Sequence, residues 1–192
     1  MRIVPVTGPR EVRPGDLAEP GTCRVPVAGP RRADWTVMTT PAVPSSHDRA
    51  LLLRAVALAE ECPRSASAFS VGALVADAAG EVIATGYSRE TGSHDHAEEI
   101  ALARLSPTDP RLATATIYSS LEPCSTRSSH PRSCTRLILD TPIPRIVFAW
   151  REPEVFVDCE GAEQLRAAGR EVIELSEFAD LARHPNAHLL GG

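Results

Sequence analysis

The sequence predicts an α/β fold in which one layered sheet carries helices on both of its faces. The first observation is alternation, because short β-rich runs and helical runs follow one another from residue 45 onward. The second is size: 192 residues with 43% hydrophobic composition bury one core well but are short for two full domains. The third is that helices separate the last three expected strands, which should therefore run parallel.

The elements are expected in the order α-β-β-α-β-α-β-α-β, with a short terminal helix. Ser45 and Asp48 resemble a capping box at the start of the first helix, which ends before Pro63. The turn at residues 77–80 joins the first two strands as a hairpin, and Gly169 ends the fourth helix. The expected helices are residues 48–61, 96–105, 134–140, 161–168 and 177–183, and the expected strands are residues 69–75, 81–86, 115–121, 145–150 and 171–175.

Residues 1–44 are expected to form an extended, proline-rich arm outside the domain, which then spans residues 45–192. Eight of the 17 prolines lie in this arm. Each proline removes a backbone donor and fixes φ, so regular structure is disfavoured there. Met38 is the only methionine besides Met1, so a shorter product that starts at Met38 is an open alternative.

Charge and composition exclude several classes of function. The formal net charge is −5, which disfavours a surface for duplex nucleic acid, since such a surface needs a basic patch. The chain has no lysine, which excludes lysine Schiff bases and the P-loop. No apolar stretch approaches 18 residues and no signal peptide is evident, so we expect a cytoplasmic protein without a membrane span.

Four residues in three short motifs carry the chemistry: His96, Glu98, Cys124 and, ten positions further on, Cys134. The chain has five cysteines, an odd number, so metal binding or catalysis is a better expectation than a disulfide framework. One imidazole and two thiolates are good zinc ligands, and three protein ligands leave the fourth position open for water. Zinc can lower the pKa of that water from 15.7 to about 7, and Glu98 could carry its proton to a substrate.

Two neighbouring residues remain alternatives for these roles. His94 lies two positions before His96 and could face the same metal from an extended segment. Glu99 is an alternative to Glu98 as the proton carrier. Because it lies in the first turn of the expected helix, it could instead stabilise the helix dipole or orient a metal ligand through a hydrogen bond.

These motifs resemble the cytidine/deoxycytidylate deaminase superfamily, whose signature is H-x-E followed by P-C-x-x-C. The matching runs are Phe-Ser-Val-Gly-Ala at residues 69–73, His-Ala-Glu-Glu at 96–99 and Leu-Glu-Pro-Cys at 121–124. Nine residues separate Cys124 from Cys134, where the superfamily commonly has two. This long insert, together with Leu-Glu-Pro-Cys-Ser, is similar to the deaminase domain of the bifunctional riboflavin-biosynthesis deaminase/reductase.

The resemblance implies a fold, a cofactor and an assembly. It implies a three-layer αβα sandwich with a five-stranded mixed sheet, and a dimer or tetramer. It implies Zn²⁺ on His96, Cys124 and Cys134, with Glu98 as the proton shuttle. One departure concerns the substrate: the riboflavin deaminases carry Pro-Asn-Pro ahead of Val-Gly, where this chain has Ser-Ala-Phe at residues 67–69.

We therefore expect a zinc-dependent hydrolytic deaminase of an aminopyrimidine nucleoside or nucleotide. Phe69 is either core packing or a wall for a planar base. Arg127, His130 and Arg132 lie in an insert without acidic residues and could bind a substrate phosphate; the alternative is a solvated loop. The alternative functions are deamination of a purine-like base in secondary metabolism and a non-catalytic zinc module. The expected partners are a small molecule and further copies of the chain.

Overall fold

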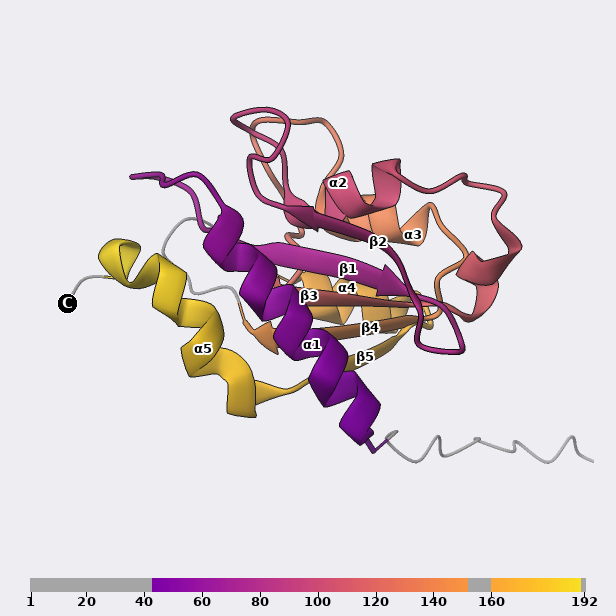
Figure 1. Ribbon diagram of the computed structural model, residues 1–192. Coiled ribbons are helices and arrows are strands. Elements are labelled where there is room, and N and C mark those ends of the chain that lie inside the picture. Colours follow the sequence, from indigo (N-terminus) through magenta and orange to yellow (C-terminus); the bar gives the residue numbers. More distant parts are fainter. Residues whose placement is uncertain (1–42, 152–159, 191–192) are drawn as a thin grey trace, which may run out of the picture. The chain divides into compact units, whose positions relative to one another are not determined.

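A five-stranded mixed sheet forms the middle layer of the computed structural model, which describes residues 43–151 and 160–190 (Figure 1). Residues 1–42 of the expected arm lie outside this range, so the domain boundary stays a prediction. The strands are β1 (Gly72–Ala76), β2 (Val82–Tyr87), β3 (Thr116–Leu121), β4 (Arg145–Trp150) and β5 (Glu171–Glu174), in the spatial order β2-β1-β3-β4-β5. β1 pairs antiparallel with β2 and β3, whereas β3, β4 and β5 run parallel, as expected.

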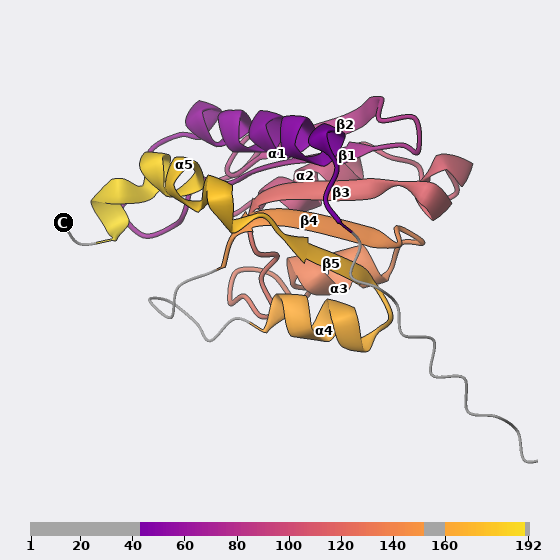
Figure 2. The ribbon, with the colours of Figure 1, turned by 90° about the horizontal axis from the view of Figure 1, so that it is seen from below.

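Helices cover both faces of the sheet, which confirms the three-layer αβα sandwich (Figure 2). On one face lie α1 (Ser46–Leu58) and α5 (Ala179–Arg183), and on the other lie α2 (Ala97–Ala103), α3 (Cys134–Leu139) and α4 (Gly161–Ala167). Short 3₁₀ turns occupy Ala59–Glu61, Pro110–Thr114, Ser176–Phe178 and His184–Leu189. No helix in the described part of the chain is long and apolar enough to cross a membrane.

Each face of the sheet has its own apolar core. Leu52 and Leu74 belong to the cluster on the α1 side, and Ile117, Ile138 and Leu165 to the cluster on the other side. All five side chains are almost completely buried. Burying a side chain of this size stabilises a fold by about 1.5–3 kcal/mol, so both layers are held mainly by apolar packing.

The predicted capping box joins α1 to the sheet. Ser45 Oγ accepts from the Asp48 N–H, and Ser45 N donates to the Asp48 carboxylate at 2.8 Å. Asp48 also accepts from the Tyr118 hydroxyl at 2.8 Å and from the Arg145 guanidinium. Burial alone would raise the pKa of Asp48, but the hydrogen bonds from Arg145, Ser45 and Tyr118 hold it well below its usual range. The helix itself begins at Ser46, two residues earlier than expected.

The first strand begins later than the sequence suggests. It was expected from residue 69, but β1 begins at Gly72. The reason is that side chains satisfy the backbone just before it: Val71 N–H donates to Ser88 Oγ at 3.2 Å, and Ser70 N–H donates to Asn186. Residues 65–71, called the wall loop below, therefore lead into the sheet without a strand partner at their centre.

Candidate metal centre and substrate cavity

Three element ends bring the predicted metal ligands together. His96 is the N-cap residue of α2 and has an extended backbone, with φ −95° and ψ 152°. Cys124 follows the end of β3, and Cys134 is the first residue of α3. Ser133 caps that helix by accepting from the Arg136 N–H at 3.2 Å, which fixes where α3 begins. The structure thus places all three side chains as the sequence predicts.

The donor atoms fit a tetrahedral divalent metal. His96 Nδ1 lies 3.6 Å from Cys124 Sγ and 3.4 Å from Cys134 Sγ. Usual zinc bond lengths of about 2.05 Å to nitrogen and 2.3 Å to sulfur place such atoms about 3.6 Å apart. Within the described residues, the group that could hold a metal comprises His96, Cys124 and Cys134, without His94.

The surroundings favour negative charge on this cluster. A hydrogen bond from the Cys134 thiol lowers the pKa of Cys124 to about 4, and His96 adds to this effect. The Cys134 backbone N–H also donates to Cys124 Sγ, at 3.3 Å. The same thiol hydrogen bond and complete burial raise the pKa of Cys134. A dication bound between the two sulfurs would stabilise negative charge on both.

Glu98 lies beside the cluster, on the first turn of α2, and lines the cavity described next. Its side chain is almost fully buried, with 3% of its surface exposed, and Oε1 accepts from Ser119 Oγ at 2.8 Å. Burial raises the pKa of Glu98, and the charge on Cys124 raises it further. A raised pKa makes the Glu98 carboxylate a better proton acceptor than an exposed one.

A cavity of about 420 Å³ opens beside these residues. His96, Glu98 and Cys124 are part of its lining, so the metal group and the buried carboxylate face the same space. The wall loop supplies another side, and residues of the Cys124–Cys134 insert supply the rim. The lining residues are Ser65, Ser67, Ala68, Phe69, Val71, Ser88, Arg89, Ser93, His94, Asp95, His96, Glu98, Leu121, Glu122, Cys124, Thr126, Arg127, Ser128 and Ser129.

The three basic residues of the insert are placed differently from one another. Arg127 lines the cavity, with 5% of its side chain exposed, and pairs with Glu99 at 2.9 Å. His130 lies 3.7 Å from the same carboxylate and outside the lining. Arg132 also lies outside the lining and pairs with Asp140 at 3.5 Å. The structure thus brings only Arg127 of the three to the cavity.

Phe69 is both packed in the core and part of the cavity lining, so the structure does not choose between the two roles that the sequence left open. Its side chain is buried and packs edge-to-face against Trp150, with ring centroids 5.3 Å apart. It also belongs to the cavity lining. A flat apolar surface of this kind suits a planar heterocycle.

Arg89 is a cavity residue that sequence reasoning missed. Its φ of 63° is unusual for a residue other than glycine. The guanidinium donates to Phe69 O at 2.9 Å and to Pro63 O at 2.6 Å, so it braces the wall loop. Positive φ at a residue other than glycine is uncommon and leaves no sequence pattern that could have predicted it.

Residues 45–150 match the family described as the cytidine and deoxycytidylate deaminase zinc-binding region. This match spans more than half of the chain and includes His96, Glu98, Cys124 and Cys134. The chain belongs to the cytidine and deoxycytidylate deaminase family. The resemblance to the superfamily predicted from the motifs is therefore confirmed.

The proteins similar to this chain include a pyrimidine deaminase and a riboflavin biosynthesis protein. The diaminohydroxyphosphoribosylamino-pyrimidine deaminase of Schizosaccharomyces pombe is 40% identical over 154 residues, which cover 76% of this chain and 37% of that protein. The riboflavin biosynthesis protein RibD of Aquifex aeolicus is 36% identical over 103 residues, which cover 54% of this chain and 27% of that protein. The chain thus spans well under half the length of these relatives.

A solved structure gives the same picture for the fold. The Thermotoga maritima diaminohydroxyphosphoribosylaminopyrimidine deaminase/5-amino-6-(5-phosphoribosylamino)uracil reductase superposes with a TM-score of 0.62 at 30% identity. The match covers 71% of this chain and 38% of that one.

Proposed function

We propose that this deaminase-family chain is a zinc enzyme that hydrolyses the exocyclic C–NH₂ bond of an aminopyrimidine nucleotide. The observation that carries the proposal is the cavity that His96 and Cys124, two of the three residues of the metal group, share with the buried Glu98. Zinc held by these three ligands would lower the pKa of water to about 7 and so supply a nucleophile at neutral pH. The overall reaction consumes one water and releases one ammonia.

Glu98 is the residue that we assign to proton transfer. Its carboxylate is held by Ser119 and is shielded from bulk water, so its proton stays within the cavity. Amine departure requires a proton, because ammonia leaves far more readily than its anion. Glu98 would therefore take one proton from the incoming water and deliver it to a ring nitrogen, then take the second from the hydroxyl left on the attacked carbon and deliver it to the leaving amine.

The substrate class rests on the relatives and on the cavity walls. The Schizosaccharomyces pombe relative is named for a phosphoribosylamino-pyrimidine, which is an aminopyrimidine nucleotide. Phe69 offers a face to the ring, and Arg127 with Thr126, Ser128 and Ser129 offers donors at the rim. His130 and Arg132 belong to the same proposal as outer contacts, although the insert would have to move to bring them to the substrate.

Ammonia release from a panel of aminopyrimidines and aminopurines, as bases, nucleosides and phosphates, tests this function. Turnover is expected with an aminopyrimidine nucleotide. Glu98→Gln should retain zinc and fold yet lose about 10²–10⁴-fold in turnover, because the amide cannot carry a proton. Glu99→Gln is the matched control and should keep most of the rate. A normal rate in Glu98→Gln would contradict the assignment, and turnover of purines alone would replace the substrate class.

Three further expectations are part of this proposal and remain predictions. They are the division into an arm at residues 1–44 and a deaminase domain at 45–192, a cytoplasmic location, and a homo-oligomer.

A further inference from the structure

The wall loop, residues 65–71, lines the cavity without a neighbouring strand to hold its centre. Five of its residues belong to the lining: Ser65, Ser67, Ala68, Phe69 and Val71. Residues 70 and 71 bond to the side chains of Asn186 and Ser88, and β1 starts only at Gly72. The position of Phe69 therefore depends on contacts from outside the loop.

Asn186 supplies a contact near the C-terminal end of the loop, at the residue next to Phe69. Its Oδ1 accepts from the Ser70 N–H at 2.6 Å, and its Nδ2 donates to the Ser70 carbonyl at 2.9 Å. The side chain thus satisfies both backbone groups of the residue next to Phe69, as a neighbouring strand would. Asn186 is 1% exposed, so these bonds have little competition from water.

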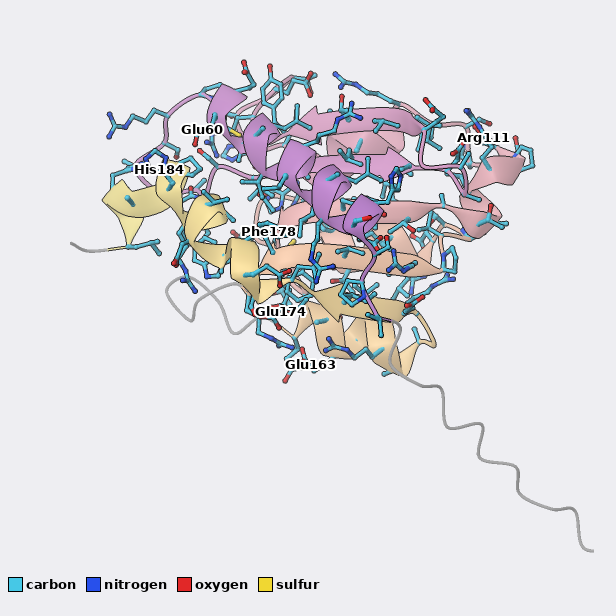
Figure 3. The ribbon with its side chains drawn as sticks, turned by 60° about the horizontal axis from the view of Figure 1, so that its bottom comes forward. Glu60, Arg111, Glu163, Glu174, Phe178 and His184 are labelled. Carbon is cyan, nitrogen blue, oxygen red and sulfur yellow. The ribbon has the colours of Figure 1, made fainter. Side chains whose placement is uncertain are left out.

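The rest of the C-terminal segment, α5 and His184–Leu189, docks beside this pair. His188 Nε2 lies 2.7 Å from the Ser65 carbonyl, at the start of the wall loop. The Arg183 guanidinium lies over the Trp150 ring, 5.4 Å from its centroid, and the same ring packs against Phe69. His184 approaches Glu60 at 3.3 Å, and Figure 3 shows these two side chains next to each other.

This segment lies outside the residues that define the family match, which end at residue 150. It reaches the wall loop rather than the metal group. Arg89 braces the same loop from the other side, but it lines the cavity and can itself touch a substrate. Asn186 is absent from the lining, so any effect it has on substrate acts through the loop.

We propose that Asn186 is a positioning residue that fixes Phe69 against the substrate ring, so that the C-terminal segment sets substrate affinity. The catalytic consequence rests on the proposed deaminase function, whereas the hold on the loop does not. Because the metal group and Glu98 lie on other elements, loss of Asn186 should affect binding of the ring and spare the chemical step.

Two readouts on the full chain test this proposal. Amide hydrogen exchange measures the hold on the loop: in Asn186→Ala, exchange of the Ser70 N–H should accelerate about ten- to thirty-fold while core strands keep their protection. Steady-state kinetics measure the consequence: KM should rise about ten-fold, with kcat changed less than about two-fold and zinc content unchanged. Leu181→Ser, on the 52% exposed side chain of α5, is the matched control and should alter neither value.

The conservative variant Asn186→Asp sharpens the test. Aspartate keeps the acceptor for the Ser70 N–H and loses the donor to its carbonyl, so its KM should lie between those of the wild type and Asn186→Ala. If Asn186→Ala does not fold, the same two readouts on Asn186→Asp decide the question.

Several results would overturn the proposal. They are unchanged exchange at Ser70, an unchanged KM despite faster exchange, or a fall in kcat that accompanies loss of zinc. A wild-type protein that releases no ammonia would instead refute the proposed function. The exchange data would still test whether Asn186 stabilises the wall loop.

Discussion

Replacing Gly161 by alanine should weaken the metal site from a distance. Gly161 is the first residue of α4, and a Cβ added there would lie 1.9 Å from the Pro123 carbonyl oxygen and 2.9 Å from Thr135 Oγ1. Ordinary carbon–oxygen contacts are about 3.3 Å, so the backbone must move by more than about 1 Å. The Pro123 carbonyl belongs to the peptide bond that leads into Cys124, one of the metal ligands.

The expected losses of stability and zinc affinity in Gly161→Ala depend on whether the Pro123 segment or α4 moves. Overpacking of this kind costs about 1–3 kcal/mol. Metal–ligand distances tolerate deviations of only about 0.2 Å, and disturbance of the groups that orient a ligand lowers metal affinity about 10–100-fold. If α4 moved instead, it would break the bond from Ala162 N–H to Glu122 Oε1, now 2.8 Å long. That bond helps to anchor the segment before Cys124.

Competition with a chromophoric zinc chelator measures the affinity, and a thermal melt measures stability. Gly169→Ala is the matched control, because its φ of +80° strains an added side chain while nothing lies within 4 Å of the new Cβ. It should cost about 1 kcal/mol of stability and leave zinc affinity unchanged. Wild-type zinc affinity in Gly161→Ala would refute the reasoning, and equal loss in both variants would indicate general destabilisation.

Three further predictions concern stability, zinc and substrate. Asp48→Asn should lower the free energy of unfolding by about 2–4 kcal/mol in urea at pH 7, since it breaks a largely buried ion pair with Arg145. Because the folded pKa of Asp48 lies well below the ordinary value for an aspartate, this contribution is present above about pH 4 and is lost as the pH falls, which urea melts at pH 7 and 3 would reveal. Removing zinc with a strong chelator should lower the melting temperature and expose Cys124 and Cys134 to thiol reagents, and Cys134→Ala should hold no zinc; full zinc in that variant would contradict the ligand set. Arg127→Ala should raise KM for a nucleotide about ten-fold and leave KM for its nucleoside nearly unchanged. Equal effects on both KM values would show that Arg127 supports the cavity structure rather than binding the phosphate.

Short-range patterns account for the parts that the sequence predicts well. The capping box at Ser45 and Asp48 and the metal group both depend on residue types near element ends, where few geometries are possible. The parallel order of the last strands follows from the helices between them. Such features need no knowledge of distant contacts.

Contacts between distant segments account for the features that sequence analysis does not predict. Asn186 bonds to Ser70 across 116 positions, and this pairing is one reason that β1 starts late. Likewise, three basic residues in one loop look equivalent in sequence, yet Arg127 turns inward to Glu99 and Arg132 outward to Asp140. No periodicity or spacing distinguishes these outcomes, because each depends on which carboxylate the folded chain brings nearby.

The Arg127–Glu99 pair also limits how strongly the insert can select a phosphate. Charged hydrogen bonds contribute about 1.5–3 kcal/mol each. In the folded chain the Arg127 guanidinium already donates to the Glu99 carboxylate at 2.9 Å and to the His94 carbonyl at 3.2 Å. To bind a substrate phosphate, Arg127 must therefore give up its bond to the Glu99 carboxylate. Only the difference in free energy between these two interactions contributes to substrate affinity. With Arg132 turned away, the expected preference for a nucleotide falls to about ten-fold from the hundred-fold that two unpaired arginines could provide.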